Sequence, residues 1–173
     1  MQKFLLNDSN QKKLALNAKN MIVRRAVAED LPRIIEIVQQ SASAAQWTGG
    51  AYEQMFSLSD RVVLVIEGDP RDRVYGFLAA HEVLGEWEIE NLAICESARR
   101  RGLGLLLLHE FLRIVKDRHG KEVFLEVRES NLAARSLYAK CTFVEADRRK
   151  SYYHNPEEDA LILKFSFLPY SEI

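Results

Sequence analysis

Arg99-Arg100-Arg101-Gly102-Leu103-Gly104 is the stretch that decides the fold, because it joins a strand pattern to a helix pattern through a short basic loop. Residues 87–94 before it read as a strand, and apolar residues from Leu103 onward recur at helical spacing. Glycines let the backbone approach a ligand closely, and a helix N-terminus carries a partial positive charge. The loop is therefore a candidate pyrophosphate site, with a solvated basic turn as the alternative.

Competing phosphate motifs are absent from the sequence, which has neither the Gly-x-x-x-x-Gly-Lys nor the Gly-x-Gly-x-x-Gly pattern. The chain carries 24 basic and 25 acidic residues, a formal net charge of −1. This balance gives no general attraction to nucleic acid or to anionic membranes. We therefore expect no direct nucleic-acid or membrane partner, and an anionic ligand has to be captured locally.

The length and composition predict one folded domain. The chain has 173 residues, of which 47% are hydrophobic and 28% charged, as in ordinary globular proteins. We expect a single domain over residues 21–173 and an N-terminal extension over residues 1–20, either a flexible or a helical arm, unless Met21 is the biological start. Cys95 and Cys141 have no metal-ligand spacing and suit a reducing cytosol as small buried side chains. We expect a cytoplasmic protein that binds no metal.

Periodicity predicts alternating strands and helices. Asp30 and Asn131 are placed to cap helices, and Gly120 stands where a left-handed helix cap belongs. Residues 41–59, around Trp47 and Tyr52, lose the pattern and predict a short helical or looped region that contacts substrate. The expected strands are residues 21–24, 62–66, 74–80, 87–94, 123–127, 143–146 and 161–167, with helices after Asp30, Leu103 and Asn131 and a Tyr152-Tyr153 loop. Strand, helix, strand, helix from residue 87 onward predicts an α/β fold with parallel pairing there.

Several motifs in order carry a resemblance to a known family. Glu90-Asn91-Leu92-Ala93-Ile94, followed by Arg99-x-x-Gly102-x-Gly104, resembles the acetyl-CoA motif of the GNAT superfamily of N-acetyltransferases. Four further motifs resemble the bacterial ribosomal-protein-alanine N-acetyltransferases of the RimI type: Leu125-Glu126-Val127-Arg128-Glu129-Ser130-Asn131, Leu137-Tyr138, Arg149-x-x-Tyr152-Tyr153 and Glu158-Asp159-Ala160. The resemblance spans about residues 21–165, and ordered motifs are far more specific than one short glycine pattern.

The resemblance implies a fold and a cosubstrate. The fold is a mixed, twisted sheet of about seven strands, splayed between its fourth and fifth strands and flanked by about four helices. The pantetheine arm of acetyl-CoA is expected in that cleft, paired with strand backbone as in β-augmentation. The implied cofactor-binding residues are Leu92, Ala93, Ile94, Arg100, Arg101, Gly102, Leu103, Gly104, Leu105 and Asn131. Asn131 is also a good N-cap, and both roles can coexist.

By the same resemblance, Glu126 is the general base and Tyr138 the general acid. Alternation places Glu126 on one strand face with Phe124 and Arg128. The alternatives are a surface carboxylate paired with Arg128, and a core ring for Tyr138. Glu88 and Glu90 on the preceding strand are rival bases.

The implied acceptor is a protein N-terminus, and the substrate-binding candidates are Tyr152, Tyr153 and Glu90. An α-amine has a pKa of ~8 against ~10.4 for lysine, so an N-terminal substrate needs only a modest base. The leading hypothesis is acetylation of the N-terminal alanine of a small-subunit ribosomal protein. Acidic residues 157–159 would then favour a basic N-terminal tail.

Two other functions stay open from the sequence: acetylation of a small amine or a lysine side chain, and a CoA-binding module without turnover. The sequence also departs from the family at one point. Thr142 stands where the family usually has glycine in the turn after the helix, and a β-branched residue disfavours a positive φ. The geometry of this turn is the feature that the departure puts in question.

Overall fold

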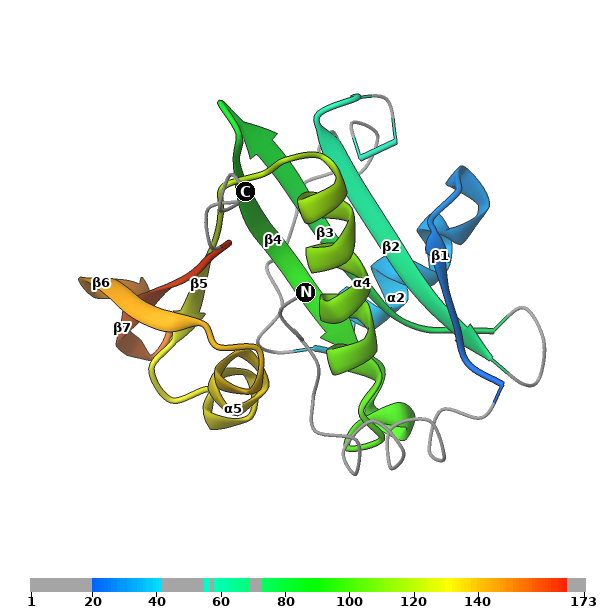
Figure 1. The fold of residues 1–173 in the computed structure, drawn as a ribbon. Coiled ribbons are helices and arrows are strands. Elements are labelled where there is room, and N and C mark those ends of the chain that lie inside the picture. Colours follow the sequence, from blue (N-terminus) through cyan, green and yellow to red (C-terminus); the bar gives the residue numbers. More distant parts are fainter. Residues whose placement is uncertain (1–19, 42–54, 57, 69–72, 168–173) are drawn as a thin grey trace.

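The computed structural model describes residues 20–41, 55–56, 58–68 and 73–167 and is built on one seven-stranded sheet with the order β1-β2-β3-β4-β5-β7-β6 (Figure 1). The strands are β1 (Ile22–Arg25), β2 (Arg61–Gly68), β3 (Arg73–Val83), β4 (Glu86–Ile94), β5 (Glu122–Arg128), β6 (Val144–His154) and β7 (Glu157–Ser166). The α-helices are α2 (Leu31–Gln39), α4 (Leu103–Asp117) and α5 (Leu132–Lys140), with short 3-10 helices at Ala28–Asp30 and Glu96–Ala98. Most of the expected N-terminal extension, and Trp47 and Tyr52, lie outside the described residues.

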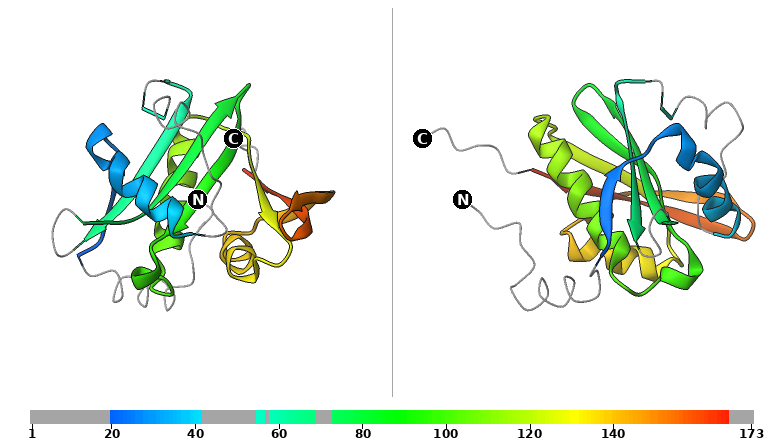
Figure 2. Two further views of the ribbon diagram at one scale, coloured as in Figure 1. Left: turned by 180° about the vertical axis from the view of Figure 1, so that it is seen from behind. Right: turned by 90° about the vertical axis from the view of Figure 1, so that its right-hand side faces the viewer.

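The sheet is mixed, as predicted. Neighbouring strands are antiparallel except β4 and β5, which are parallel and joined through α4. The helix α4 covers one face of the sheet and α2 the opposite face (Figure 2). The described residues contain three α-helices, slightly fewer than the four that the resemblance implied.

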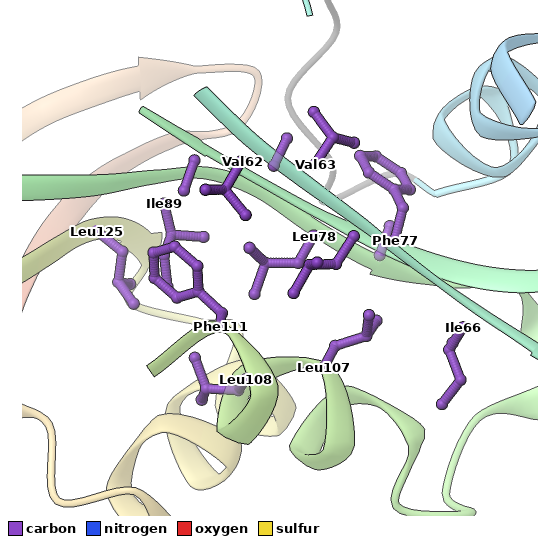
Figure 3. Close-up of a cluster of buried hydrophobic side chains, with 14 of the residues drawn as sticks. Val62, Val63, Ile66, Phe77, Leu78, Ile89, Leu107, Leu108, Phe111 and Leu125 are labelled. Carbon is purple, nitrogen blue, oxygen red and sulfur yellow. The ribbon is translucent and has the colours of Figure 1, made fainter. Parts of the chain in front are cut away.

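The largest part of the core lies between α4 and the sheet. Leu107, Leu108 and Phe111 are fully buried against Leu78 and Ile89 (Figure 3). The ring of Phe111 also meets the ring of Trp87 edge to face at a centroid distance of 5.7 Å. This packing stabilises the paired parts of the two parallel strands, residues 86–89 of β4 and 122–125 of β5. On the other face, α2 buries Ile34, Ile37 and Val38 completely.

The strands β4 and β5 part at a β-bulge. Their parallel register ends at the pair Ile89 and Leu125. On the other edge of β4, Ala80 pairs with Ile89 but Ala79 pairs with Asn91, so Glu90 is the extra residue of a bulge. A bulge bends the strand and increases its twist. The expected splay is therefore confirmed, and it begins at Glu90.

Two predicted helix caps need correction. His119, with φ 57°, is the left-handed residue after α4, and Gly120 follows it. A Cβ at Gly120 would lie 2.4 Å from Val115 Cγ1, so glycine is required there by close packing. Asp30 does stand at the N-cap of α2, but its carboxylate makes no cap hydrogen bond to that helix. It accepts hydrogen bonds from Arg24 and from the backbone of Val27 instead.

Thr142 keeps the turn that glycine makes in the family. Its φ is 62°, in the left-handed region, and its N–H donates to the carbonyl of Ala139 over 3.0 Å. The next N–H, from Phe143, donates to the carbonyl of Tyr138 over 3.2 Å. These two bonds form a Schellman motif at the end of α5. The turn geometry is thus retained, at the cost of a β-branched residue in a strained conformation.

Thr142→Gly is expected to stabilise the fold by about 1 kcal/mol, because glycine removes the left-handed strain and loses part of that gain to the entropy of the unfolded chain. The measurement is the free energy of unfolding from urea titration. Thr142→Val is the control and should not stabilise. A lower stability for the glycine variant would contradict the strain assigned to this turn.

Candidate active site

The basic loop before α4 contains two residues with a left-handed backbone conformation. Arg100 and Gly102 have φ of 62° and 83°, both left-handed, and α4 begins at the next residue. Arg99 is committed to the fold, since its Nε donates to the carbonyl of Ile94 over 3.1 Å and its Nη2 lies 3.4 Å from Ser41 Oγ. Arg100 and Arg101 are exposed at the loop surface. The loop therefore combines a helix N-terminus with two exposed cationic side chains.

Gly104, in the first turn of α4, lies against both α5 and β4. A Cβ placed on it would lie 3.2 Å from Leu137 Cδ2 of α5 and 3.5 Å from Leu92 Cδ2 of β4. A larger side chain in this position would push the three elements apart. The glycine therefore lets the first turn of α4 sit against the free part of β4.

Beyond the bulge, β4 has β3 on one edge but has left β5 on the other. The N–H of Cys95 donates to the carbonyl of Tyr75 on the β3 side over 2.8 Å. Because such groups alternate along a strand, the N–H groups of Leu92 and Ile94 point toward the gap. This edge is a strand segment with backbone groups directed into the splay.

Asn131 begins α5 on the opposite side of the gap. Its Oδ1 accepts a hydrogen bond from the N–H of Ala134 over 3.1 Å, so it is the N-cap of this helix. The capping role was one of the two predicted for it. Its contact with a cofactor stays a prediction.

Glu126 lies on the sheet face opposite α4, since its neighbour Leu125 points into the α4 core. Its Oε1 is 2.7 Å from Nη1 of Arg149 on β6. The alternative partner, Arg128, instead stacks over the ring of Tyr153 at 3.9 Å and lies 3.3 Å from Glu158. A hydrogen bond to Glu126 raises the pKa of Tyr152. The alternative to the general-base role, a surface carboxylate paired with Arg128, is therefore not found, and Arg149 is the partner of Glu126.

Glu90 faces the same side of the sheet but has different partners. Its Oε2 is 2.5 Å from Nη1 of Arg61, and its Oε1 is 3.5 Å from Nδ1 of His81. The other side of the His81 ring is 3.9 Å from Glu88. Sequence reasoning named Glu88 and Glu90 but missed Arg61 and His81, because these two join the cluster through the pairing of β2 with β3.

Tyr138 lies in α5 and is 6% exposed. Its ring packs at 5.6 Å from the ring of Phe143. Burial raises the pKa of its hydroxyl, so the group carries its proton at neutral pH. Tyr138 is thus part of the core and also a protonated phenol, and the two predicted roles do not exclude one another.

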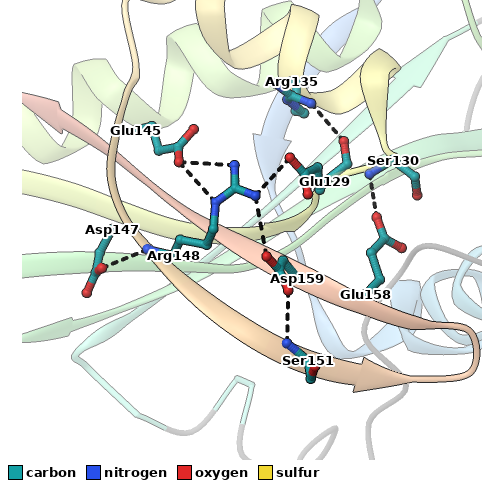
Figure 4. Close-up of polar contacts among 9 residues, drawn as sticks. All are labelled: Glu129, Ser130, Arg135, Glu145, Asp147, Arg148, Ser151, Glu158 and Asp159. Carbon is teal, nitrogen blue, oxygen red and sulfur yellow. Dashed lines mark hydrogen bonds and ion pairs between the residues drawn. The ribbon is translucent and has the colours of Figure 1, made fainter.

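The expected Tyr152-Tyr153 loop is wrong, because both residues belong to β6. Arg149 pairs with Ala160 and Tyr153 with Glu158, so residues 150–152 bulge opposite Asp159 alone. The Oδ1 of Asp159 accepts a hydrogen bond from the N–H of Ser151, whose φ is 50°, over 2.9 Å (Figure 4). The bulge presents Arg149 and Tyr152 to Glu126.

The acidic residues of β7 have internal partners. Ser151 Oγ donates to Glu157 over 2.7 Å, and the backbone of Ser130 donates to Glu158. Asp159 also lies 3.4 Å from Arg148, which reaches Glu129 at 2.9 Å (Figure 4). These carboxylates therefore stabilise the hairpin of β6 and β7. Because their charges are already paired within the protein, they attract a basic N-terminal tail of the substrate less strongly than the sequence suggested.

The model of the acetyltransferase (GNAT) family matches residues 28–143. The chain belongs to this family. A relative from Haemophilus influenzae named [ribosomal protein bS18]-alanine N-acetyltransferase is 34% identical over 145 residues, 82% of this chain and 96% of the relative. One of the same name from Salmonella typhimurium is 34% identical over 136 residues, 78% of this chain and 89% of the relative.

Solved structures agree with the GNAT fold. The ribosomal-protein-S18-alanine N-acetyltransferase of Escherichia coli matches with a TM-score of 0.78 and 26% identity, covering 88% of this chain and 99% of that one. NAA60 of Arabidopsis thaliana in complex with acetyl-CoA matches with a TM-score of 0.77 and 19% identity, covering 85% and 99%. The second likeness concerns the fold alone.

Within the described part of this GNAT chain, no group of three or more His, Cys, Asp or Glu side chains is arranged to hold a metal ion. No helix among the same residues is long and apolar enough to span a membrane.

Asp159→Ala is expected to lower kcat/KM about tenfold, because losing the Ser151 contact frees the bulge that aims Tyr152, and small misplacements at a site are costly. The measurement is steady-state acetylation of an alanine-starting peptide. Asp147→Ala is the matched control, since Asp147 also accepts one backbone hydrogen bond on β6, from Arg148 over 2.7 Å, away from the bulge. Equal losses in both variants would contradict a role for the bulge.

Proposed function

We propose that this enzyme transfers an acetyl group from acetyl-CoA to the α-amine of a protein, the N-terminal alanine of a small-subunit ribosomal protein. The relatives named for this activity on bS18 support the substrate, and they match about four-fifths of the chain. The observation that carries the proposal is the split between β4 and β5, with the edge of β4 that β5 leaves on one side and Glu126 on the other. A ribosomal substrate places the reaction in the cytoplasm.

The free edge of β4 suits the pantetheine arm of acetyl-CoA. The backbone of Leu92, Ala93 and Ile94 would bind the amides of that arm, as a strand binds an added strand. The loop and first turn of α4 would bind the pyrophosphate; these residues are Arg100, Arg101, Gly102, Leu103, Gly104 and Leu105. The absence of a Cβ at Gly104 and the left-handed loop residues support this fit. Asn131 would contact the cosubstrate from the opposite side of the gap.

Acetyl-CoA supplies an activated thioester carbonyl. The acceptor nitrogen forms a bond to this carbon, and the carbon–sulfur bond breaks. Glu126 takes the proton that leaves the amine, directly or through a water, and Tyr138 gives a proton to the departing sulfur. Burial keeps Tyr138 protonated in the resting enzyme, which is the state that a general acid requires.

The partners of the two candidate bases favour Glu126 over Glu90. Both side chains of the Glu90–Arg61 pair are 21% exposed, and the carboxylate also faces His81. The Glu126–Arg149 pair is more open, because the Arg149 side chain is 52% exposed. A half-buried pair is costly to break, whereas an exposed one is weak. The two carboxylates are equally exposed, at 22% and 21%, so Glu126 is favoured because its arginine is the easier one to displace. Tyr152, Tyr153 and Glu90 line the acceptor side.

Glu126→Gln is expected to lower kcat at neutral pH by about 10²-fold, the contribution of a general base, because the amide cannot take the proton. Glu90→Gln is the matched control and should lower kcat less. Steady-state rates with saturating acetyl-CoA make the comparison. The reverse ranking would move the base to Glu90.

Tyr138→Phe is expected to lower kcat by about 10²-fold with little change in the binding of acetyl-CoA, since the ring and its packing on Phe143 remain. Because Tyr138 is also a core residue, the thermal unfolding of the wild type and the variant is compared to show that the fold is unchanged. An unchanged kcat would leave Tyr138 as a core ring only.

The acceptor class is tested by comparing three substrates under one set of conditions: an alanine-starting basic peptide, the same peptide with a blocked N-terminus and a free lysine, and a polyamine. The proposal expects mass spectrometry to find acetylation of the α-amine, at the highest kcat/KM of the three. Preferred turnover of the lysine or the polyamine would replace the substrate proposed here. Binding of acetyl-CoA without any product would indicate a module without turnover.

A further inference from the structure

The resting structure already places a cation on the proposed base. The guanidinium of Arg149 lies 2.7 Å from Glu126, the carboxylate that accepts the amine's proton in the proposed function. The pair is asymmetric in exposure, because the carboxylate side chain is 22% exposed and the arginine side chain 52%. Water therefore reaches the arginine more easily than the carboxylate, so Arg149 can move into solvent when an acceptor binds to Glu126.

Tyr152 gives the arginine a second contact. The guanidinium lies over the Tyr152 ring at 5.4 Å, and the carboxylate of Glu126 raises the pKa of the Tyr152 hydroxyl. Arg149 stands at the start of the bulge that Asp159 holds. A guanidinium that leaves the carboxylate can therefore stay against the aromatic ring, where a cation is attracted by the ring face.

The substrate amine is positively charged and its acetylated product is not. An α-amine with a pKa of ~8 arrives at neutral pH mostly as an ammonium ion, so it competes with the guanidinium for one carboxylate. After acetylation the nitrogen is an amide without charge. The product therefore cannot form an ion pair with Glu126.

We propose that Arg149 is an exchangeable counter-ion of Glu126, which the ammonium of the acceptor displaces on binding and which returns when the uncharged product has formed and Glu126 has released its proton to solvent. This inference rests on the proposed function and identifies the residue that neutralises Glu126 while no cationic amine is bound. Arg149 is a positioning residue in this scheme and takes no proton.

The strength of the pair sets the size of the effect. The Arg149 side chain is 52% exposed, and ion pairs that solvent reaches are weak, so the competition costs the substrate no more than about a fivefold loss of affinity. That is small enough for the substrate to overcome with its other contacts. The Arg61–Glu90 pair, more buried on the arginine side, is a poorer candidate for such exchange.

The test is equilibrium binding, which needs no turnover. Isothermal titration calorimetry with CoA present in place of acetyl-CoA measures the Kd of an alanine-starting peptide and of the same peptide acetylated at its N-terminus. In Arg149→Gln the free-amine peptide should bind about two- to fivefold more tightly, while the acetylated peptide binds as before. Arg149→Lys keeps the positive charge and should resemble the wild type.

Two controls separate exchange from general effects of charge. Arg113→Gln removes an arginine of similar exposure, 60%, which pairs with Asp117 at 2.7 Å on α4, and it should change neither Kd. In a Glu126→Gln background, Arg149→Gln should no longer improve binding, because the carboxylate that the two cations share is gone.

Two results would overturn the inference. Weaker binding of both peptides to Arg149→Gln would mean that Arg149 binds the peptide itself, and unchanged binding of both would mean an inert surface pair. Failure of the proposed function appears separately, in the wild type, as preferred acetylation of the polyamine or the lysine peptide. The same binding experiment is then repeated with that amine and its acetylated form.

Discussion

The single extra residue at Glu90 is the constraint on which the rest of the site depends. Below it, β4 is paired on both edges, and Trp87 and Ile89 are fixed under α4. Above it, β4 stays paired with β3 while β5 diverges. The core continues past the start of the gap through Ala93 of β4 and Val127 of β5, so the two strands part without leaving the core. A bulge provides this bend at the cost of one unpaired residue in the ladder.

A second bulge, in β6, serves the other side of the site. It places Arg149 and Tyr152 against Glu126, and an aspartate from β7 holds its backbone. The two bulges have different supports. The one in β4 is backed by buried side chains, and the one in β6 lies in a strand that is almost entirely exposed and relies on polar contacts. The acceptor side is therefore the part of the site more open to adjustment.

On the sheet face opposite α4, Glu126 and Glu90 each have an arginine beside them. What distinguishes the two pairs is their access to water. Exposure makes the Glu126 pair weak and replaceable, whereas the Glu90 pair is tied into a cluster with His81 and Glu88. The difference comes from strand position, since Arg61 and His81 are direct partners across β2 and β3, while Arg149 reaches Glu126 from beyond β7.

Local turns were predictable only in part. The pattern placed the end of α4 correctly, but it assigned the left-handed position to Gly120, whereas His119 takes it and Gly120 is needed for space beside Trp87. Thr142 shows the opposite case, where the whole turn overrides the preference of one residue, because two backbone hydrogen bonds fix it. Residue preference is a weak local term, and tertiary packing decides when the two disagree.

The sequence by itself determined the order of strands and helices, the parallel crossover through α4, the family and the class of its cosubstrate, because these depend on periodicity and on motifs that are continuous in the chain. Only the tertiary structure decided that Tyr152 and Tyr153 lie in a strand, that Arg149 rather than Arg128 pairs with Glu126, and that Arg61 and His81 surround Glu90. These contacts join residues far apart in sequence. They depend on strand register and on the two bulges, and a one-residue change in register would turn the side chains to the other face of the sheet.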